Sequence, residues 1–179
     1  MFAENGVPVW DADAVVHKLY SSDGAAVDPI GKLVPGAVTD MGIDRGVLRA
    51  RVSEDASLLS KIETIVHPLV AEDRQAFLRR HAAERIVVLD IPLLLEGGGR
   101  EEVDRILVVS TSESEQRRRV LQRDGMDEET FKRLLSRQMP DAEMRACAVY
   151  VIHTDDLETT RESVEALIQK LRGERRQHA

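Results

Sequence analysis

The stretch Ile86-Val87-Val88-Leu89-Asp90 decides the fold of this chain of 179 residues. Four apolar residues in a row, most of them β-branched, indicate a strand that is buried on both faces, as in parallel sheets. A second run of this kind, Ile106-Leu107-Val108-Val109, follows further along the chain. Strands separated by helical segments favour a parallel sheet with right-handed crossovers. The sequence therefore predicts an α/β fold, with these two runs at the centre of an aliphatic core.

Helical patterns and shorter strands surround the two runs. A strand at 7–10 leads into an amphipathic helix, and the segment 21–85 is predicted to be helical without a clear strand. Within that segment the expected helices are at 44–52, 55–66 and 68–83, with Pro68 in a first helical turn, where proline is tolerated. The remaining expected elements are a strand at 105–110, a helix at 112–123, a helix that begins near Asp127, a strand at 148–152 and a helix at 157–171.

The composition predicts one soluble domain in a reducing cytoplasm. A chain of this length can bury roughly 70% of the surface that its unfolded form exposes, which is enough for one core. The net charge of −7 argues against a general nucleic-acid or membrane surface. No apolar stretch approaches the ~20 residues that cross a bilayer. The single cysteine, Cys147, has no disulfide partner within the chain, and we expect it to be buried.

Two carboxylates, Asp11 and Asp13, stand where a predicted strand passes into a helix. In open α/β sheets, ligands bind at the carboxyl ends of the strands. Carboxylates at that edge can act as a general base or hold a metal ion through its water shell. The alternative is structural, with Asp13 capping a helix that starts at Ala14 while Asp11 is solvated. The spacing alone fits both interpretations.

A basic helix face is predicted within 112–123. Gln116, Arg119 and Arg123 lie at positions i, i+3 and i+7, so they share one side of the helix. Guanidinium groups suit phosphate oxygens because they offer paired N–H donors. The alternative is a solvated face in which Glu115 and its acidic neighbours pair with the arginines. The helix stop after Arg123 predicts a helix-turn-helix flap at 119–138, of the kind that closes over nucleotides.

No phosphate-binding loop of the form G-x-x-x-x-G-K-[ST] occurs among the 179 residues. The nearest match, 26–33, lacks the first glycine and the hydroxyl residue and follows no strand. The triple glycine 97–99 lacks the lysine and precedes two glutamates, so we expect a flexible loop there. The histidines have no metal-ligand spacing, and His67-Pro68 is explained on local grounds as a corner between two helices.

Five motifs occur in the order typical of dephospho-CoA kinases, and the chain resembles that family from residue 1 to about 171. The motifs are Val9-Trp10-Asp11-Ala12-Asp13, Ile65-Val66-His67-Pro68-Leu69-Val70, Leu89-Asp90-Ile91-Pro92-Leu93-Leu94-Leu95-Glu96, the segment from Gln116 to Asp124, and Arg137-Gln138-Met139-Pro140. Two positions depart from the family pattern. The family commonly carries an acidic residue where this chain has Val149, and an Asp-Asn pair near the adenine where it has His153-Thr154.

The resemblance implies a P-loop kinase fold of three layers, with a parallel sheet, a helical CoA-binding insertion and a helical lid. The whole chain, 1–179, is then a single domain. Its core is expected to comprise 1–20, 85–118 and 144–171, its insertion 21–84, and its lid about 119–143. The implied reaction, the last step of coenzyme A synthesis, moves the γ-phosphate of ATP to the ribose 3′-hydroxyl of dephospho-CoA with Mg²⁺. The implied partners are ATP and dephospho-CoA, with neither nucleic acid nor membrane.

The same resemblance implies roles for single residues. Asp13 is the base toward the 3′-hydroxyl, Asp11 supports the magnesium–water shell, and neither is a direct metal ligand. Arg123 is expected to be catalytic. The residues expected at the nucleotide or in the lid are Gln116, Arg119, Arg123, Arg137 and Gln138. The residues expected to line or brace the substrate side are His67, Pro68, Pro92 and Glu96.

The family's first strand, which is central in the sheet, and its phosphate loop have no counterpart here. Residues 1–6 resemble a helix end closed by Asn5-Gly6, as if an earlier element were cut off. We expect turnover by the chain as it stands to be impaired, because the loop's amides and lysine hold the β and γ phosphates. The alternatives are a truncated or mis-started chain of the same family without activity, another P-loop nucleotide or nucleoside kinase, and a non-enzymatic helical interaction module.

These alternatives make different predictions. In-frame codons upstream of Met1 that encode a strand and the phosphate loop would indicate a longer, active kinase. Activity on a nucleoside monophosphate, and none on dephospho-CoA, would select another P-loop kinase. A helical interaction module has no affinity for ATP or dephospho-CoA.

Overall fold

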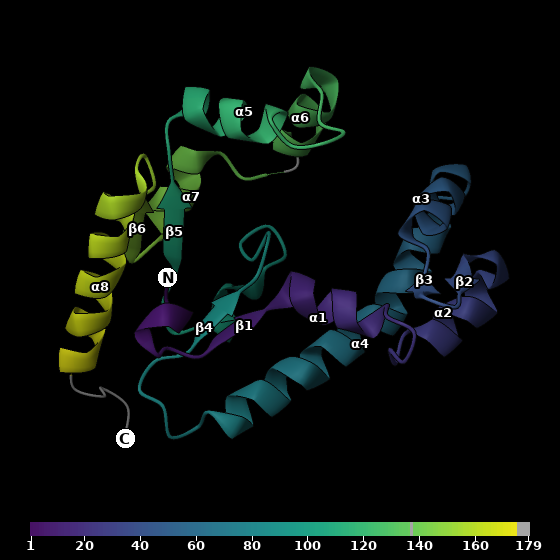
Figure 1. Cartoon of the computed structure of the whole chain (residues 1–179), viewed down its shortest axis with the longest axis horizontal. Coiled ribbons are helices and arrows are strands. Elements are labelled where there is room, and N and C mark those ends of the chain that lie inside the picture. Colours follow the sequence, from purple (N-terminus) through teal and green to yellow (C-terminus); the bar gives the residue numbers. More distant parts are fainter. Residues whose placement is uncertain (137, 175–179) are drawn as a thin grey trace. The chain divides into compact units, whose positions relative to one another are not determined.

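The computed structural model describes residues 1–136 and 138–174. It divides into two compact units, one formed by Pro8–Pro92 and the other by Met1–Val7 together with the chain from Leu93 onward. Each unit contains one pair of parallel strands, which confirms the predicted α/β class (Figure 1). The parallel strands form two separate two-stranded sheets, β1–β4 and β5–β6, and a third pair, β2–β3, is antiparallel.

In the unit Pro8–Pro92, β1 (Val9–Asp11) lies parallel to β4 (Val88–Asp90), and Asp11 is opposite Asp90 in the register. β1 passes directly into α1 (Ala12–Leu19). The other elements are α2 (Val27–Leu33), the 3-10 helix η2 (Pro35–Ala37), β2 (Val38–Thr39), β3 (Gly42–Ile43), α3 (Arg45–Glu54) and α4 (Ser57–Arg80). Helix α4 packs against α1, α2 and α3, and so connects the short helices to the strand pair.

Two predictions for this unit are wrong. Pro68 does not separate two helices, because α4 continues through it. Proline removes one backbone donor, whereas a buried face at Ile62, Val66 and Phe77 holds the helix in place on both sides. The hairpin β2–β3 also interrupts the segment expected to be helical. The hairpin packs closely against the chain at Tyr20, and this close approach requires glycine at position 42. Gly42 has a φ of 103°, and a Cβ atom there would lie 2.1 Å from the Tyr20 carbonyl oxygen.

The core of this unit lies mainly among its helices. Trp10 is only 4% exposed and belongs to a cluster that otherwise consists mostly of aliphatic side chains from α1 to α4. The run Ile86–Leu89, expected at the centre of the core, is half-buried. That prediction is wrong because β4 is hydrogen-bonded to β1 along one edge, and no other strand in the described part of the chain pairs with it.

In the other unit, β5 (Leu107–Ser110) lies parallel to β6 (Tyr150–His153), and α8 (Leu157–Gly173) packs against β6 (Figure 1). Val108 and Ile152 are buried, whereas Val109 is 63% exposed. The second apolar run is therefore buried on one face only, in contrast to its predicted burial on both. The other elements are the 3-10 helices η1 (Ala3–Asn5) and η3 (Gly99–Glu102), α5 (Glu113–Leu121), α6 (Glu128–Leu135) and α7 (Asp141–Cys147).

Several local predictions for this unit can be compared with the structure. α6 begins as expected, with Asp127 accepting a hydrogen bond from the Thr130 amide at 2.7 Å. η1 ends at Gly6 in the left-handed conformation, as the Asn-Gly pair predicted. Cys147 is half-buried and free, against the expectation of burial.

Among residues 1–136 and 138–174, none of the helices combines the length and the apolar character that a membrane span requires.

Candidate active site

Three carboxylates gather at the carboxyl ends of the strand pair β1–β4. Asp11 ends β1 and Asp90 ends β4, and the parallel register places the two residues opposite each other. Asp13 lies in the first turn of α1, and all three residues are exposed. The structure thus brings Asp11 and Asp13 to the ligand-binding edge of the strands, as predicted, and adds Asp90 to them. The sequence signal for Asp90 was its place at the end of an apolar run.

Asp11 is the residue that caps α1. Its backbone is extended and its Oδ1 accepts a hydrogen bond from the Ala14 amide at 2.9 Å. The alternative in which Asp13 caps a helix starting at Ala14 is therefore wrong, because the helix begins at Ala12 and Asp13 already lies inside its first turn. The two carboxylates therefore differ in their contacts, since Asp11 stabilises the helix end whereas Asp13 is exposed and does not make the capping bond.

The electrostatics of this edge favour a cation. Although Asp90 is exposed as a residue, partial burial of its carboxyl raises the pKa of that group above its ordinary value, and the negative charges of Asp11 and Asp13 raise the pKa further. Neighbouring ionised carboxylates create a local negative potential, and this potential disfavours the ionised form of each of them. A positive ion or a shared proton relieves this repulsion, which gives the edge a chemical reason to bind one.

The donor set fits Mg²⁺ held through water. Among the described residues, no group of three or more His, Cys, Asp or Glu side chains is arranged to hold a metal ion directly. One oxygen of Asp11 is already bonded to the Ala14 amide. Mg²⁺ dehydrates reluctantly and commonly keeps several waters while one or two carboxylates hold it. Asp11, Asp13 and Asp90 match that requirement through their remaining oxygens.

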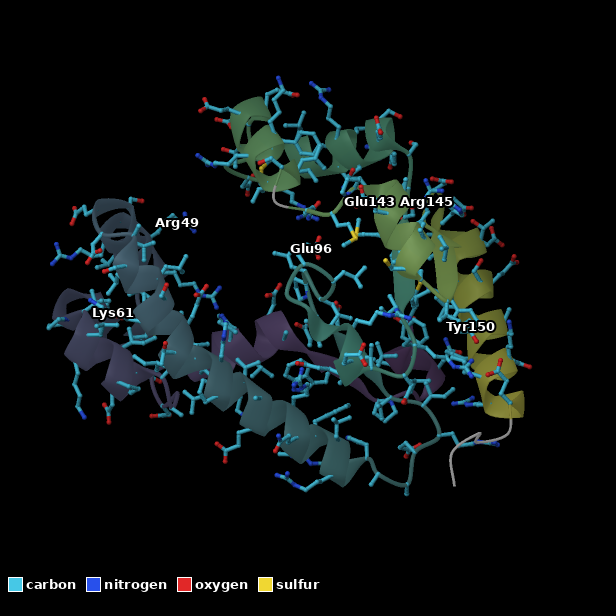
Figure 2. The ribbon with its side chains drawn as sticks, turned by 180° about the vertical axis from the view of Figure 1, so that it is seen from behind. Arg49, Lys61, Glu96, Glu143, Arg145 and Tyr150 are labelled. Carbon is cyan, nitrogen blue, oxygen red and sulfur yellow. The ribbon has the colours of Figure 1, made fainter. Side chains whose placement is uncertain are left out.

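The predicted substrate residues fall in both units. His67 and Pro68 are neighbours on α4 and are exposed. Pro92 ends the same unit, and Leu93 after it has a φ of 58°, a conformation that bulky residues rarely adopt. Glu96, which is labelled in Figure 2, belongs to the other unit. Its Oε1 accepts a hydrogen bond from the Met139 amide at 2.7 Å. Glu96 therefore braces the chain between α6 and α7.

Arg119, predicted to clamp phosphates, is engaged with its own unit. Its Nε donates to Glu115 Oε1 at 2.6 Å, and its Nη2 donates to the Thr154 carbonyl oxygen at 2.5 Å. Arg118 makes a two-pronged bond to the same Glu115 carboxylate, at 2.7 and 2.6 Å. These two guanidinium groups hold the pKa of Glu115 down at about 2. The paired-face alternative is thus confirmed for Arg118 and Arg119.

Arg123 differs from these arginines. Since α5 ends at Leu121, the predicted helix to residue 123 is too long, and Arg123 lies exposed in the following turn. Its amide donates to the Val120 carbonyl oxygen at 3.0 Å. Gln116 is half-buried on α5, and Gln138 is exposed after α6. Arg137 lies outside the described residues.

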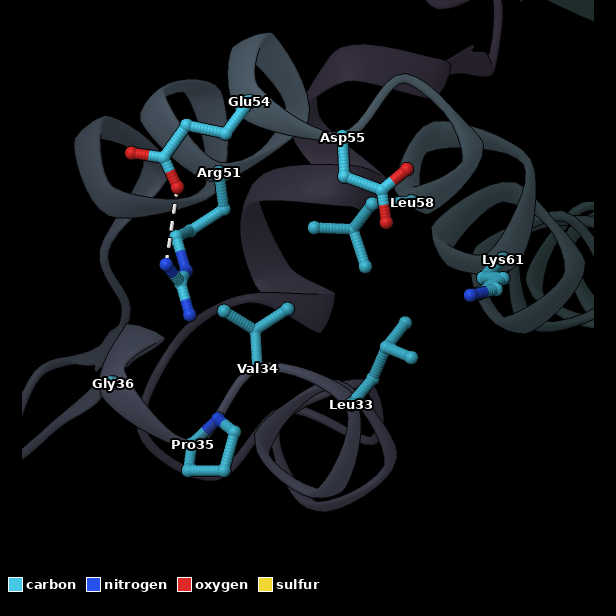
Figure 3. Close-up of a pocket in the computed structure, with 9 residues that line it drawn as sticks. All are labelled: Leu33, Val34, Pro35, Gly36, Arg51, Glu54, Asp55, Leu58 and Lys61. Carbon is cyan, nitrogen blue, oxygen red and sulfur yellow. Dashed lines mark hydrogen bonds and ion pairs between the residues drawn. The ribbon is translucent and has the colours of Figure 1, made fainter.

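A cavity of about 430 Å³ lies where α2 and α3 end and α4 begins (Figure 3). Leu33, Val34 and Leu58 line it with apolar atoms, and the ion pair between Arg51 and Glu54, 3.0 Å apart, lies at its rim. None of the predicted site residues lines this cavity. Along α4, Leu58 precedes His67 by nine residues, a rise of about 13 Å. The cavity is also distinct from the carboxylate edge, since none of Asp11, Asp13 and Asp90 lines it.

Comparison with known proteins gives the family. The family model described as dephospho-CoA kinase matches residues 1–159. A dephospho-CoA kinase of Jannaschia sp. (strain CCS1) is 60% identical over 171 residues, which cover 96% of this chain and 88% of the relative. One of Mesorhizobium japonicum is 50% identical over 178 residues, covering 98% of this chain and 89% of the relative.

Solved structures agree with this assignment. A crystal structure from Thermus thermophilus matches with a TM-score of 0.74 and 30% identity, covering 95% of this chain and 87% of that one. The dephospho-CoA kinase of Campylobacter jejuni shares the fold, with a TM-score of 0.66 at 20% identity and the same two coverages. The fold is that of the P-loop kinases, as predicted. Within that class, the chain belongs to the dephospho-CoA kinase family.

Proposed function

We propose that this chain serves the phosphorylation of dephospho-CoA at its ribose 3′-hydroxyl, with ATP as the phosphoryl donor and Mg²⁺ as the cofactor. The product is coenzyme A, so the reaction is the last step of its synthesis, and we place it in the cytoplasm. The single observation that carries the proposal is the gathering of Asp11, Asp13 and Asp90 at the carboxyl edge of β1 and β4. Family membership supports the choice of substrates.

Asp13 is the proposed general base. Its carboxylate is exposed in the first turn of α1, and the capping bond is made by Asp11 instead. As the 3′-oxygen attacks the γ-phosphorus, Asp13 takes the hydroxyl proton, the bond from the γ-phosphorus to the bridging oxygen breaks, and ADP leaves. Asp11 and Asp90 would hold the water shell of Mg²⁺. When bound, this ion neutralises charge on the β and γ phosphates.

Arg123 is the proposed phosphate contact of the lid. Its exposed position in the turn between α5 and α6 suits a guanidinium group that meets a nucleotide. Arg119 is proposed to brace the lid through Glu115 and Thr154 while remaining near the nucleotide. Gln116, Arg137 and Gln138 complete the proposed nucleotide side. His67, Pro68, Pro92 and Glu96 remain the proposed substrate side.

Ligand binding tests the substrate assignment independently of turnover. Calorimetric titration of the chain should give tighter binding of dephospho-CoA than of AMP, because the pantetheine arm supplies contacts that AMP lacks. Asp13→Asn should leave dephospho-CoA binding almost unchanged, since a base acts mainly in the transition state. Asp40→Asn, an exposed residue in the turn between β2 and β3, is the matched control and should likewise leave dephospho-CoA binding unchanged. Binding of a nucleoside monophosphate without binding of dephospho-CoA would assign the chain to another acceptor.

A further inference from the structure

We infer that Asp73 on α4 is a positioning residue that fixes Asp11 and Asp13 by holding Trp10 and Lys18 on either side of them. The functional meaning of this inference rests on the proposed roles of the two carboxylates. The contacts themselves belong to one unit, Pro8–Pro92.

Asp73 uses both carboxylate oxygens toward the segment that carries the proposed active site. Its Oδ1 accepts a hydrogen bond from the Trp10 indole Nε1 at 2.9 Å. Its Oδ2 lies 3.7 Å from the Lys18 Nζ. Trp10 is the central residue of β1, and Lys18 lies in the last turn of α1. Asp11 and Asp13 lie between these two contacts in the sequence.

The bond to Trp10 is the stronger of the two contacts. Trp10 is 4% exposed, and a buried indole N–H needs an acceptor. An ionised acceptor makes that hydrogen bond stronger than a neutral one does. The Lys18 side chain, in contrast, is 78% exposed, and exposed ion pairs contribute little. Loss of the Asp73 carboxylate would therefore chiefly leave the Trp10 indole without its partner.

The position of Trp10 determines that of the carboxylates. In the parallel register Trp10 faces Leu89, and the next pair along is Asp11 with Asp90. Asp11 in turn accepts a hydrogen bond from the Ala14 amide. This bond fixes the first turn of α1 and hence the position of Asp13. α4 also carries His67, six residues before Asp73, a rise of about 9 Å. One helix therefore joins a proposed substrate contact to the proposed base.

Amide exchange measured by NMR tests the inference without any need for turnover. The Ala14 amide reports the position of Asp11, and the Ile30 amide, bonded to the Ala26 carbonyl oxygen at 3.0 Å, reports the stability of the same unit. Asp73→Ala should accelerate exchange at Ala14 about tenfold or more relative to Ile30. The chain has one tryptophan, so its single indole N–H resonance should shift in the same variant.

Two matched variants separate positioning from simple stabilisation. Asp73→Asn keeps an oxygen acceptor for the indole and should restore near-normal exchange at Ala14. Glu72→Ala, an exposed neighbour on α4, should have no effect. Equal acceleration at Ala14 and Ile30, or no rescue by asparagine, would reduce Asp73 to a structural residue.

A second variant covers the possibility that Asp73→Ala does not fold. Trp10→Phe keeps a buried aromatic ring but removes the N–H donor together with part of the indole's volume, and it should also accelerate exchange at Ala14 relative to Ile30. Unchanged exchange at Ala14 in this variant would overturn the inference. Failure of the wild-type chain to bind dephospho-CoA would count against the proposed function, whereas the exchange result would stand.

Discussion

Asp90 shows how a carboxyl at the end of a strand can oppose the stability of the fold. Its carboxyl is placed opposite Asp11 by the strand register, and burial together with the charges of Asp11 and Asp13 raises its pKa. A raised pKa means that the folded chain holds the Asp90 proton more tightly than the unfolded chain does. The stabilising effect is complete below the unfolded pKa of about 3.9 and is lost as pH rises through the raised folded value.

We therefore predict that Asp90→Asn raises the melting temperature at pH 7. Asparagine removes the ionised carboxyl that repels Asp11 and Asp13, so the gain should shrink as the pH is lowered toward 4. Thermal unfolding followed by circular dichroism between pH 4 and 7 measures both effects. Asp40→Asn, an exposed residue in the turn between β2 and β3, is the control and should show no such dependence. A lower melting temperature for Asp90→Asn at pH 7 would contradict the repulsion.

The residues of the carboxylate edge were predictable to different degrees. Asp11 and Asp13 follow an apolar stretch and precede a helical pattern, so local sequence places them at a strand end. Asp90 also follows an apolar run, but its role depends on the pairing of β4 with β1, across almost eighty residues of chain. The capping residue was misassigned because α1 follows β1 without a linker, so the helix begins at Ala12, two residues earlier than the sequence pattern indicated.

At the scale of elements, ion pairs hold the helices α5 and α6. Arg117 on α5 binds Glu128 on α6 through two hydrogen bonds, of 3.1 and 2.5 Å. Glu115 joins Arg118 and Arg119, and Arg119 continues to Thr154 after β6. The contact between Arg117 and Glu128 connects α5 to α6, and the contacts of Arg119 connect α5 to the strand pair β5–β6. Charged side chains thus set the position of α5, which has no buried residue of its own.

We predict that Glu115→Gln destabilises this unit at neutral pH. Hydrogen bonds from Arg118 and Arg119 lower the pKa of Glu115 from its ordinary 4.5 to about 2. A lowered carboxyl pKa contributes stability above about pH 4.5 and loses it as the pH falls through about 2. The difference in melting temperature between wild type and Glu115→Gln should therefore close in that window.

Glu113→Gln is the matched control for this prediction. It removes the same charge from the same first turn of α5, so any effect of the helix dipole is shared. Circular dichroism melts of the three proteins from pH 7 to pH 2 give the comparison. A gap between wild type and Glu115→Gln that persists unchanged at pH 2 would show that the arginine contacts do not govern the stability of α5.

Element boundaries were predicted where local chemistry sets them and missed where packing does. Asp127 begins α6 because its carboxylate satisfies the Thr130 amide, a short-range signal. α4 continues through Pro68 because buried residues on both sides keep the helix against its neighbours, which a local proline rule cannot include. The hairpin β2–β3 has strands of two residues, too short for any alternating pattern.

At the scale of the whole molecule, the order of five motifs predicted the family that the comparisons confirm. Motif order is informative because members of one family share a chain topology, so their characteristic segments recur in the same sequence order. What the 179 residues lack is a G-x-x-x-x-G-K-[ST] sequence. In phosphoryl transfer such a loop supplies backbone amides and a lysine to the β and γ phosphates, and its hydroxyl residue contacts Mg²⁺.

The last prediction is that this 179-residue chain transfers phosphate at least about 10²-fold more slowly than the ~1–100 s⁻¹ usual for kinases. Coupled measurement of ADP release with dephospho-CoA gives the rate. Joining a strand and a G-x-x-x-x-G-K-[ST] loop to the amino end of the chain should raise it, because positioned amides and a lysine stabilise the charge of the transferring phosphate. The same extension with alanine in place of its lysine is the control and should stay slow. Full turnover by the 179 residues alone would show that other groups of this chain hold the phosphates.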